Sequence, residues 1–329
     1  MTDAVSIVVP AFNEGAAIRQ TLEELGRLAA TLGRPLEVVV VNDGSRDDTL
    51  QQARAVSPSN FDLVVVDLSR NFGKEAALSA GLAVATGSAV IPIDADLQDP
   101  PELIPEMIRL WEEGHDVVLA RRADRSADGF MKRFTAAQFY RLMNRVSDVP
   151  LPENVGDFRL MDRAVVDVIR ALPENRRFMK GLFAWAGFRT TTLDYARPAR
   201  VAGETKFNAL RLVNLAIEGL TSFSTAPLRV ATGIGALVAL LAFAYGSWIV
   251  LRTLIFGVDL PGYASLMSVL LFMSGLQLMA LGLIGEYVGR TYIESKRRPA
   301  YVIRSTYRIE GPVRSLSEAR RADAPKGQG

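Results

Sequence analysis

The sequence predicts an α/β fold with a mostly parallel sheet, followed by a membrane-attached region. Short apolar runs alternate with stretches of helical spacing in the first third of the chain, and polar clusters directly follow several of these runs. Two long stretches without charged residues stand near the end. Alternating strands and helices are typical of parallel sheets covered by helices on both faces. With 329 residues, the chain is long enough for one sizeable domain and a further part.

The predicted elements of the sheet domain follow one another along the first 120 residues. We expect strands at residues 5–10, 36–41, 63–66, 89–93 and 117–120, because each is a short apolar run. Helical spacing of apolar residues predicts helices at 15–32 and 73–85. Ligands of such sheets bind at the C-terminal ends of the strands. The residues that follow the strands are therefore the first candidates for a site.

Polar residues follow three of these strands directly, at residues 13–14, 42–45 and 94–99. The last cluster holds three acids within six residues. Two carboxylates at i and i+2, here Asp94 and Asp96, can share a hard divalent cation that also holds substrate phosphates. A lone Asp-X-Asp is equally compatible with a solvated acidic turn. Clusters at three strand ends favour the binding site.

The composition limits the chemistry that such a site could perform. Cysteine is absent, which excludes disulfides, thiolate catalysis and cysteine-ligated zinc. The single histidine, His115, is expected in a surface turn, so catalytic triads and histidine metal sites are not expected. The net charge of +2 argues against a nucleic-acid partner. Neither Gly-x-Gly-x-x-Gly nor Gly-x-x-x-x-Gly-Lys-Ser/Thr is present, which disfavours dinucleotide dehydrogenases and P-loop NTPases.

The two uncharged stretches, 230–251 and 260–285, are each long enough to cross ~30 Å of hydrocarbon as a helix. We expect membrane-spanning helices at 228–256 and 260–288, joined into a hairpin; core helices of an oversized soluble domain are the alternative. Basic residues follow the second span, at Arg290 and 296–298, whereas the connector carries one Arg and one Asp. Positive residues stay in the cytoplasm, so the first 206 residues and the tail, 289–329, are expected there. The N-terminus lacks the features of a signal peptide.

Residues 207–227, between the two parts, alternate apolar and polar side chains at near-helical spacing. An amphipathic helix on the membrane surface fits this pattern, and a helix packed on the soluble domain is the alternative. We expect the last ten residues, 320–329, to be disordered. Small residues in the two spans predict packing against other copies, and so a homo-oligomer. These are Gly233, Gly235, Gly275 and Gly282.

Six segments carry a resemblance to a known family. Val8-Val-Pro-Ala-Phe-Asn-Glu14, Val41-Asn-Asp-Gly-Ser45 and Asp94-Ala-Asp96 resemble family 2 glycosyltransferases, which have a GT-A fold. Segments 68–77, 156–163 and 177–187 are more specific. Together with the hairpin, they are similar to the polyprenyl-phosphate glycosyltransferase branch, of the bactoprenol glucosyltransferase and dolichol-phosphate mannose synthase-like type. The resemblance extends from about residue 5 to 298.

This resemblance implies a donor site for a UDP-sugar and a divalent metal, Mg²⁺ or Mn²⁺. The metal surroundings would be Asp94, Asp96 and Gln98. Segment 203–206 looks like the family's mobile loop, whose lysine can reach phosphate. The nucleotide-sugar residues would be Pro10, Ala11, Asn13, Glu14, Asp43, Asp94 and Lys206.

The resemblance also implies an acceptor site for a polyprenyl phosphate. The matching basic residues are Arg122, Lys132 or Arg133, and Arg200. A basic face turned toward anionic lipid is the alternative for the first three. Asp157 stands where the family's presumed catalytic base falls. Because a phosphate with a second pKa near ~6 is largely dianionic at neutral pH, Asp157 could instead orient the acceptor.

The implied reaction is inverting transfer of a hexose, glucose from UDP-glucose, to undecaprenyl phosphate at the inner membrane. GDP-mannose, UDP-N-acetylglucosamine, UDP-galactose and a UDP-modified arabinose are alternative donors. A processive polysaccharide synthase would need a Gln-x-x-Arg-Trp motif and a larger membrane channel, and a sugar nucleotidyltransferase would need a glycine-rich opening loop; none is present. A non-catalytic membrane scaffold, the alternative from another class, would not need acids at three strand ends.

Overall fold

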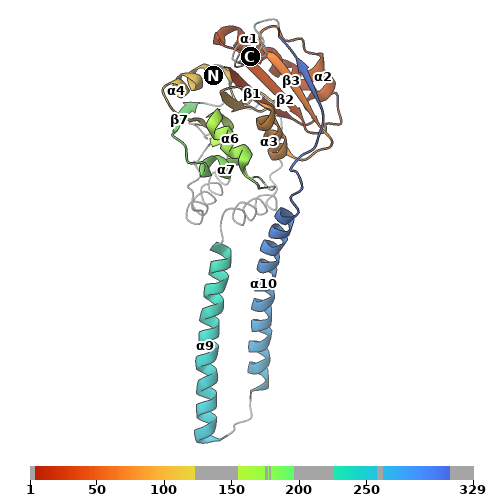
Figure 1. Ribbon diagram of the computed structural model, residues 1–329. Helices are drawn as coiled ribbons and strands as arrows, with labels where there is room; N and C mark the ends of the chain where they lie inside the picture. Colours follow the sequence, from red (N-terminus) through yellow and green to blue (C-terminus); the bar gives the residue numbers. More distant parts are fainter. Residues whose placement is uncertain are drawn as a thin grey trace, which may run out of the picture. The chain divides into compact units, whose positions relative to one another are not determined.

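The computed structural model describes residues 4–122, 155–174, 177, 179–195, 226–257 and 262–311 (Figure 1). These residues belong to two compact units, one built around a sheet and one made of two long helices. The sheet unit also contains residues 299–311.

The sheet has eight strands in the order β7-β5-β6-β4-β1-β2-β3-β8. Pairings β1/β2, β1/β4, β2/β3 and β5/β7 are parallel, whereas β6 lies antiparallel between β4 and β5, and β8 lies antiparallel to β3. Every described strand except β6 and β8 therefore runs in one direction, which confirms the expected mostly parallel sheet. The strands are β1 (Val5–Ala11), β2 (Leu36–Asn42), β3 (Asp62–Leu68), β4 (Ala89–Pro92), β5 (Val117–Arg122), β6 (Val155–Asp162), β7 (Thr190–Tyr195) and β8 (Ile303–Ile309).

Helices cover both faces of this sheet, as the alternating sequence predicts (Figure 1). Helix α1 buries Ile18, Leu22 and Leu25, spaced i, i+4 and i+7, in the core beside alternate residues of β1 and β2. Helix α3 packs on the opposite face, so closely that a Cβ at Gly81 would lie 2.2 Å from Val8 Cγ1. The helices of this unit are α1 (Gly15–Leu32), α2 (Thr49–Ala55), α3 (Lys74–Val84), α4 (Ile104–Glu112), α6 (Arg163–Ala171) and α7 (Met179–Trp185), with a 3₁₀ turn at Pro101–Leu103.

Three strands of the sheet, β6, β7 and β8, are not among those that the sequence predicts. None of them is a continuous apolar run, because each contains several polar residues, and β7 and β8 are the two outermost strands. Strand β8 lies within the stretch expected to be a basic tail, and Arg304 and Arg308 alternate with side chains that are partly covered. The strands and the two helices expected in the sheet domain are present, with ends that differ by at most two residues.

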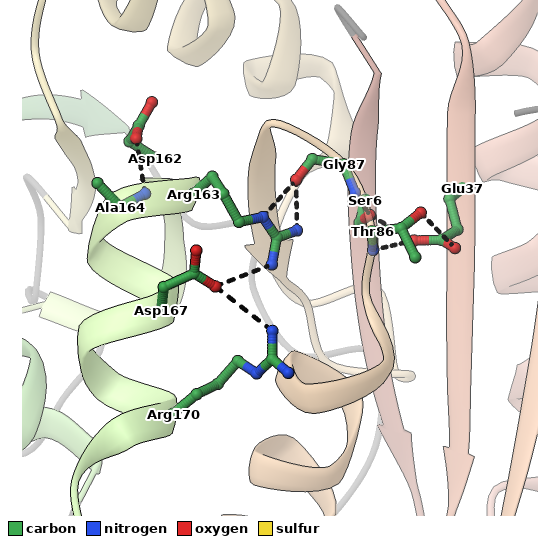
Figure 2. A network of polar contacts seen from close by, with 9 residues as sticks. All are labelled: Ser6, Glu37, Thr86, Gly87, Asp162, Arg163, Ala164, Asp167 and Arg170. Carbon is green, nitrogen blue, oxygen red and sulfur yellow. Dashed lines mark hydrogen bonds and ion pairs between the residues drawn. The ribbon is translucent and has the colours of Figure 1, made fainter. Parts of the chain in front are cut away.

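A buried polar network ties the N-terminal ends of the parallel strands together (Figure 2). Glu37, on β2, is only 2% exposed and accepts hydrogen bonds from Ser6 Oγ at 2.5 Å, Thr86 N at 2.7 Å and Thr86 Oγ1 at 3.0 Å. Ser6 Oγ also accepts from Gly87 N at 2.8 Å, and Arg163 Nε donates to the Gly87 carbonyl at 2.9 Å. Because each group has a partner, this network is structural.

The second unit consists of two long antiparallel helices, α9 (Ala226–Phe256) and α10 (Tyr263–Ser295), which contact each other (Figure 1). The segments Ala231–Phe256 and Phe272–Ser295 are long and apolar enough to cross a membrane by length and composition. Helix α10 continues to Ser295, past the expected end of the second span at residue 288. Most of the expected amphipathic segment, 207–225, lies outside the described residues.

Candidate active site

The loops that follow β1 and β2 are joined by hydrogen bonds at the C-terminal edge of the sheet. Asn13 adopts a left-handed backbone (φ 56°), which asparagine tolerates better than most residues. Its Oδ1 accepts from Arg46 N at 2.9 Å, and its own N–H donates to Ser45 Oγ at 3.0 Å. Glu14 N donates to Thr49 Oγ1 at 2.9 Å. Pro10 and Ala11 end β1 directly before this loop pair. Four of the residues expected to bind the nucleotide sugar therefore lie together.

Asp43 organises a third loop at the same edge. Its side chain is buried, and its two carboxylate oxygens accept from Phe72 N at 2.7 Å and Gly73 N at 2.9 Å. Burial raises the pKa of Asp43, and the two hydrogen bonds partly offset that rise. The neighbouring Gly44 has φ +63°, and a Cβ there would lie 2.4 Å from the Arg70 carbonyl carbon. The carboxylate expected to hold base and ribose thus also fixes the start of α3.

The Asp-X-Asp segment follows β4 in a tight, strained turn. Leu97 has φ +52°, a left-handed conformation that costs on the order of 1–3 kcal/mol for such a residue and occurs most often at functional sites. Asp96 Oδ1 accepts from Gln98 N at 3.1 Å, and Asp96 Oδ2 accepts from the Gln98 side-chain amide. Thr21 Oγ1 donates to the Ala95 carbonyl at 2.6 Å and anchors the turn on α1.

Negative charge accumulates between the first loop and this turn. The pKa of Glu14 is raised, first by burial and then by the charges of Asp96, Asp47 and Asp94. Asp94, Asp96 and the Gln98 side-chain carbonyl are hard oxygen donors, so they fit Mg²⁺ or Mn²⁺. Within the described part of the chain, no three Asp, Glu or His side chains are arranged to hold a metal ion alone. A cation here would need further ligands, such as diphosphate oxygens.

Lys74 contacts both Asp94, a candidate metal ligand, and Asp157, the candidate catalytic residue. Strand β6, which carries Asp157, pairs antiparallel with β4, with Val90 opposite Met161, and Asp94 follows β4. Lys74, the first residue of α3, lies between them: its Nζ is 2.6 Å from Asp94 Oδ1 and 2.8 Å from Asp157 Oδ2. Sequence reasoning assigned Lys74 no role, although it lies in segment 68–77.

Arg122 is held at the same edge by a buried tyrosine and a buried acid. Arg122 Nε donates to Tyr195 Oη at 3.3 Å, and Tyr195 Oη donates to Asp99 Oδ1 at 2.9 Å. An Arg122 nitrogen also lies 3.9 Å from Asp99. Burial raises the pKa of Tyr195. Asp99 is the third acid of the cluster at 94–99, so the turn with the candidate metal ligands also supports the candidate phosphate-binding arginine.

A buried cation supports the first residues of β6. Arg159 is only 3% exposed; its Nη2 donates to the Gly156 carbonyl at 2.7 Å, and its guanidinium carbon lies 4.1 Å from the ring centroid of Phe183, on α7. Burial lowers the pKa of Arg159 to about 10, and the charges of Asp157 and Glu75 oppose that shift. Arg159 therefore braces the strand that presents Asp157.

The site gathers most of the predicted residues and adds four others. Pro10, Ala11, Asn13, Glu14, Asp43, Asp94, Asp96, Gln98, Arg122 and Asp157 all lie on β1, β2, β4, β5 or β6 or in the loops at this edge. Lys132, Arg133, Arg200 and Lys206 lie outside the described residues. The residues that sequence reasoning missed are Lys74, Asp99, Arg159 and Tyr195. The first three belong to quoted motifs, whereas Tyr195 gave no signal of its own.

Comparisons with known proteins agree with this geometry. The model of the family glycosyl transferase family 2 matches residues 6–170, and that of the GtrB C-terminal hairpin matches residues 226–291. The bactoprenol glucosyl transferase of Shigella phage SfV is 51% identical over 301 residues, covering 92% of this chain and 98% of that protein. The prophage bactoprenol glucosyl transferase homolog of Escherichia coli K12 is 51% identical over 300 residues, covering 91% and 98%.

Among solved structures, the glucosyl-3-phosphoglycerate synthase of Mycobacterium tuberculosis has a TM-score of 0.44 and 22% identity. That match covers 67% of this chain and 78% of the other. The sequence relatives match nearly their whole length, both the sheet unit and the helical hairpin. The chain therefore belongs to glycosyl transferase family 2, with a GT-A fold and a GtrB-type C-terminal hairpin, and is a glycosyltransferase.

Proposed function

We propose that this chain transfers glucose from UDP-glucose to undecaprenyl phosphate and forms a β-linked polyprenyl-phosphate sugar. The names of the two relatives at 51% identity, both bactoprenol glucosyl transferases, support the acceptor class and the sugar. The observation that carries the proposal is the convergence at one sheet edge: Asp94 and Asp157 lie on either side of Lys74, with Arg122 at the end of the neighbouring strand β5.

On the donor side, the loops after β1, β2 and β4 bind the nucleotide sugar. Asn13, Glu14 and Asp43 form the wall that faces base and ribose. Asp94, Asp96 and Gln98 would hold Mg²⁺ or Mn²⁺, which would neutralise the charge that develops on the departing nucleoside diphosphate. Lys206, on the segment proposed to close over the donor, would add a cation to the diphosphate.

On the acceptor side, Arg122 binds the lipid phosphate. A guanidinium matches the geometry of a phosphate through two parallel hydrogen bonds, and Tyr195 fixes its direction. Lys132, Arg133 and Arg200 contribute further positive charge. The acceptor phosphate, with a second pKa near ~6, is mostly dianionic at neutral pH and is ready to attack the anomeric carbon.

Asp157 orients the acceptor in this proposal. Its Oδ2 lies 2.8 Å from the ammonium of Lys74, and this ion pair holds the direction of the carboxylate. A dianionic acceptor needs little proton removal, so a strong base is not required. One in-line displacement inverts the anomeric carbon, from an α-linked donor to a β-linked product.

The membrane arrangement follows from the charge pattern. We place the sheet unit and the tail in the cytoplasm, with α9 and α10 spanning the inner membrane and copies packing through the small residues of the spans. A reporter fused after Gly329 should then report the cytoplasm, and one inserted between Gly257 and Gly262 should report the far side. The reverse pattern would contradict this topology.

A donor panel tests the proposed reaction. The full chain in detergent is incubated with undecaprenyl phosphate and labelled UDP-glucose, UDP-galactose, UDP-N-acetylglucosamine or GDP-mannose, and the anomeric configuration of the product is determined by NMR. We expect UDP-glucose to give the highest kcat/KM and a β-linked lipid product. Preference for another donor would show that glucose is not the transferred sugar. An α-linked product would contradict the inverting mechanism, and no transfer from any donor would contradict the proposed reaction.

A further inference from the structure

We propose that Lys74 is a placeholder cation, which occupies the position between Asp94 and Asp157 until the donor arrives and so couples metal binding to nucleotide binding. The inference rests on the proposed function, because it concerns the metal and donor of that reaction. Lys74 is a positioning residue in this account, acting through the two carboxylates.

The position of Lys74 is fixed from both ends. Its backbone follows Gly73, whose N–H donates to Asp43 at 2.9 Å, so the buried carboxylate of Asp43 sets where α3 begins. Its ammonium contacts Asp94 at 2.6 Å and Asp157 at 2.8 Å. The Lys74 side chain is 47% exposed, but its backbone is anchored by a buried loop, and its ammonium contacts one acid after β4 and one on β6.

The Lys74 ammonium forms an ion pair with each of the two carboxylates, Asp94 and Asp157. Asp94 therefore carries a fixed counter-ion. Asp96, its partner in the Asp-X-Asp, is engaged by the backbone and side-chain amide of Gln98.

A metal ion that arrives alone must displace this ammonium from Asp94 and gains few ligands in return. A metal ion that arrives with a nucleoside diphosphate carries phosphate oxygens as ligands, and the phosphate charge gives the displaced ammonium a new partner. Weak metal binding without nucleotide and strong binding with it then follow. The remaining contact with Asp157 keeps that carboxylate aligned during the exchange.

The test measures Mn²⁺ binding rather than activity. The full chain in detergent is titrated with Mn²⁺ and followed by electron paramagnetic resonance, with and without UDP, for wild type, Lys74→Met, Lys74→Arg and Arg19→Met. Arg19 forms an exposed ion pair with Glu23 on α1, with side chains 66% and 53% exposed, so its loss removes one positive charge away from the site. Thermal unfolding shows that each variant is folded, and Lys74→Gln replaces Lys74→Met if the latter is not.

We expect Lys74→Met to bind Mn²⁺ without UDP about tenfold more tightly than wild type, a change of ~1.4 kcal/mol, and to show a smaller gain from UDP. Lys74→Arg keeps a cation and should retain the weak metal binding of wild type. Equal Mn²⁺ affinity in Lys74→Met and wild type, or an equal increase in Arg19→Met, would overturn the proposal. Failure of the proposed reaction would appear separately, as absence of lipid-linked sugar from wild type.

Discussion

Acidic side chains at the N-terminal edge of the sheet differ in burial and hydrogen bonding from those at the C-terminal edge. At the N-terminal edge, Glu37 is 2% exposed and receives three hydrogen bonds from Ser6 and Thr86 (Figure 2). At the C-terminal edge, the side chains of Asp94 and Lys74 are 37% and 47% exposed. Leu97 is strained beside them, and nearby acids raise the pKa of Glu14.

The difference shows how burial and saturation separate a structural tie from a site. A buried carboxylate that accepts three hydrogen bonds, as Glu37 does, supports the fold, and its loss costs stability. Half-exposed acids in a strained turn are available to a cation or a substrate. Variants at the C-terminal edge should therefore lose activity with little change in stability, and variants at the N-terminal edge should lose stability with little change in activity.

The largest effect is expected at the metal-binding acids. Asp96→Asn removes one charge from the candidate metal site and weakens both cation binding and neutralisation of the leaving group. We expect kcat to fall by about 10²–10³-fold, the usual range for one strong electrostatic contact in a transition state. The melting temperature should stay near that of wild type, because Asp96 is exposed. Full wild-type activity in excess chelator would contradict this assignment.

The pH dependence of Asp157→Asn distinguishes orientation from base catalysis. If Asp157 orients the acceptor, the activity ratio of variant to wild type should be nearly constant between about pH 6 and 8.5. A general base would matter most near pH 6, where monoanionic acceptor is abundant, and the variant would recover as the acceptor becomes dianionic. Steady-state rates at saturating donor decide the question; recovery by more than about tenfold would contradict orientation.

At the N-terminal edge, substitution of Glu37 should lower the stability of the fold. Glu37→Gln places an amide N–H₂ where the carboxylate accepts from Ser6 and Thr86, so buried donors lose their partner. We expect a loss of about 1–3 kcal/mol in the free energy of unfolding and a melting temperature lower by several degrees, measured on the full chain in detergent. kcat of the folded fraction should be unchanged; a loss as large as that of Asp96→Asn would show that the two edges are not independent.

The smallest effect is expected at Tyr195. Tyr195→Phe removes the hydroxyl that joins Arg122 to Asp99, but leaves the ring in the core. The loss of orientation, about 0.5–1.5 kcal/mol, should raise the KM for lipid phosphate several-fold and leave the KM for the donor unchanged. An increase confined to the KM for the donor would contradict the assignment of Arg122 to the lipid phosphate and would indicate that it binds the nucleotide sugar.

The sequence predicts the sheet domain well where elements are apolar and local. Strands β1 to β5 are mostly apolar, and α1 has clear helical spacing, so their positions can be read directly. Strand β8 could not be predicted, because its partner β3 lies more than 230 residues away and only three of its seven residues are partly covered. Residues 303–309 resemble a solvated tail until that pairing is known.

Some residues of the candidate site can be identified from the sequence, whereas others depend on how the strands pair. Asp94, Asp96 and Asp43 follow apolar strands, so the rule that ligands bind at strand ends identifies them from the sequence. Lys74 and Tyr195 could not be identified, because their roles depend on the pairing of β4 with β6 and of β5 with β7. No local pattern predicts that Asp94 and Asp157 contact the same lysine, since this is a consequence of strand order.

Transfer of labelled glucose from UDP-glucose to undecaprenyl phosphate, measured in parallel on wild type, Asp96→Asn and Glu37→Gln, tests the division between the two edges most directly. We expect labelled lipid from wild type and from folded Glu37→Gln at similar rates, and about 10²–10³-fold less from a stably folded Asp96→Asn. Labelled lipid from Asp96→Asn at the wild-type rate would show that the C-terminal edge is not the site of transfer.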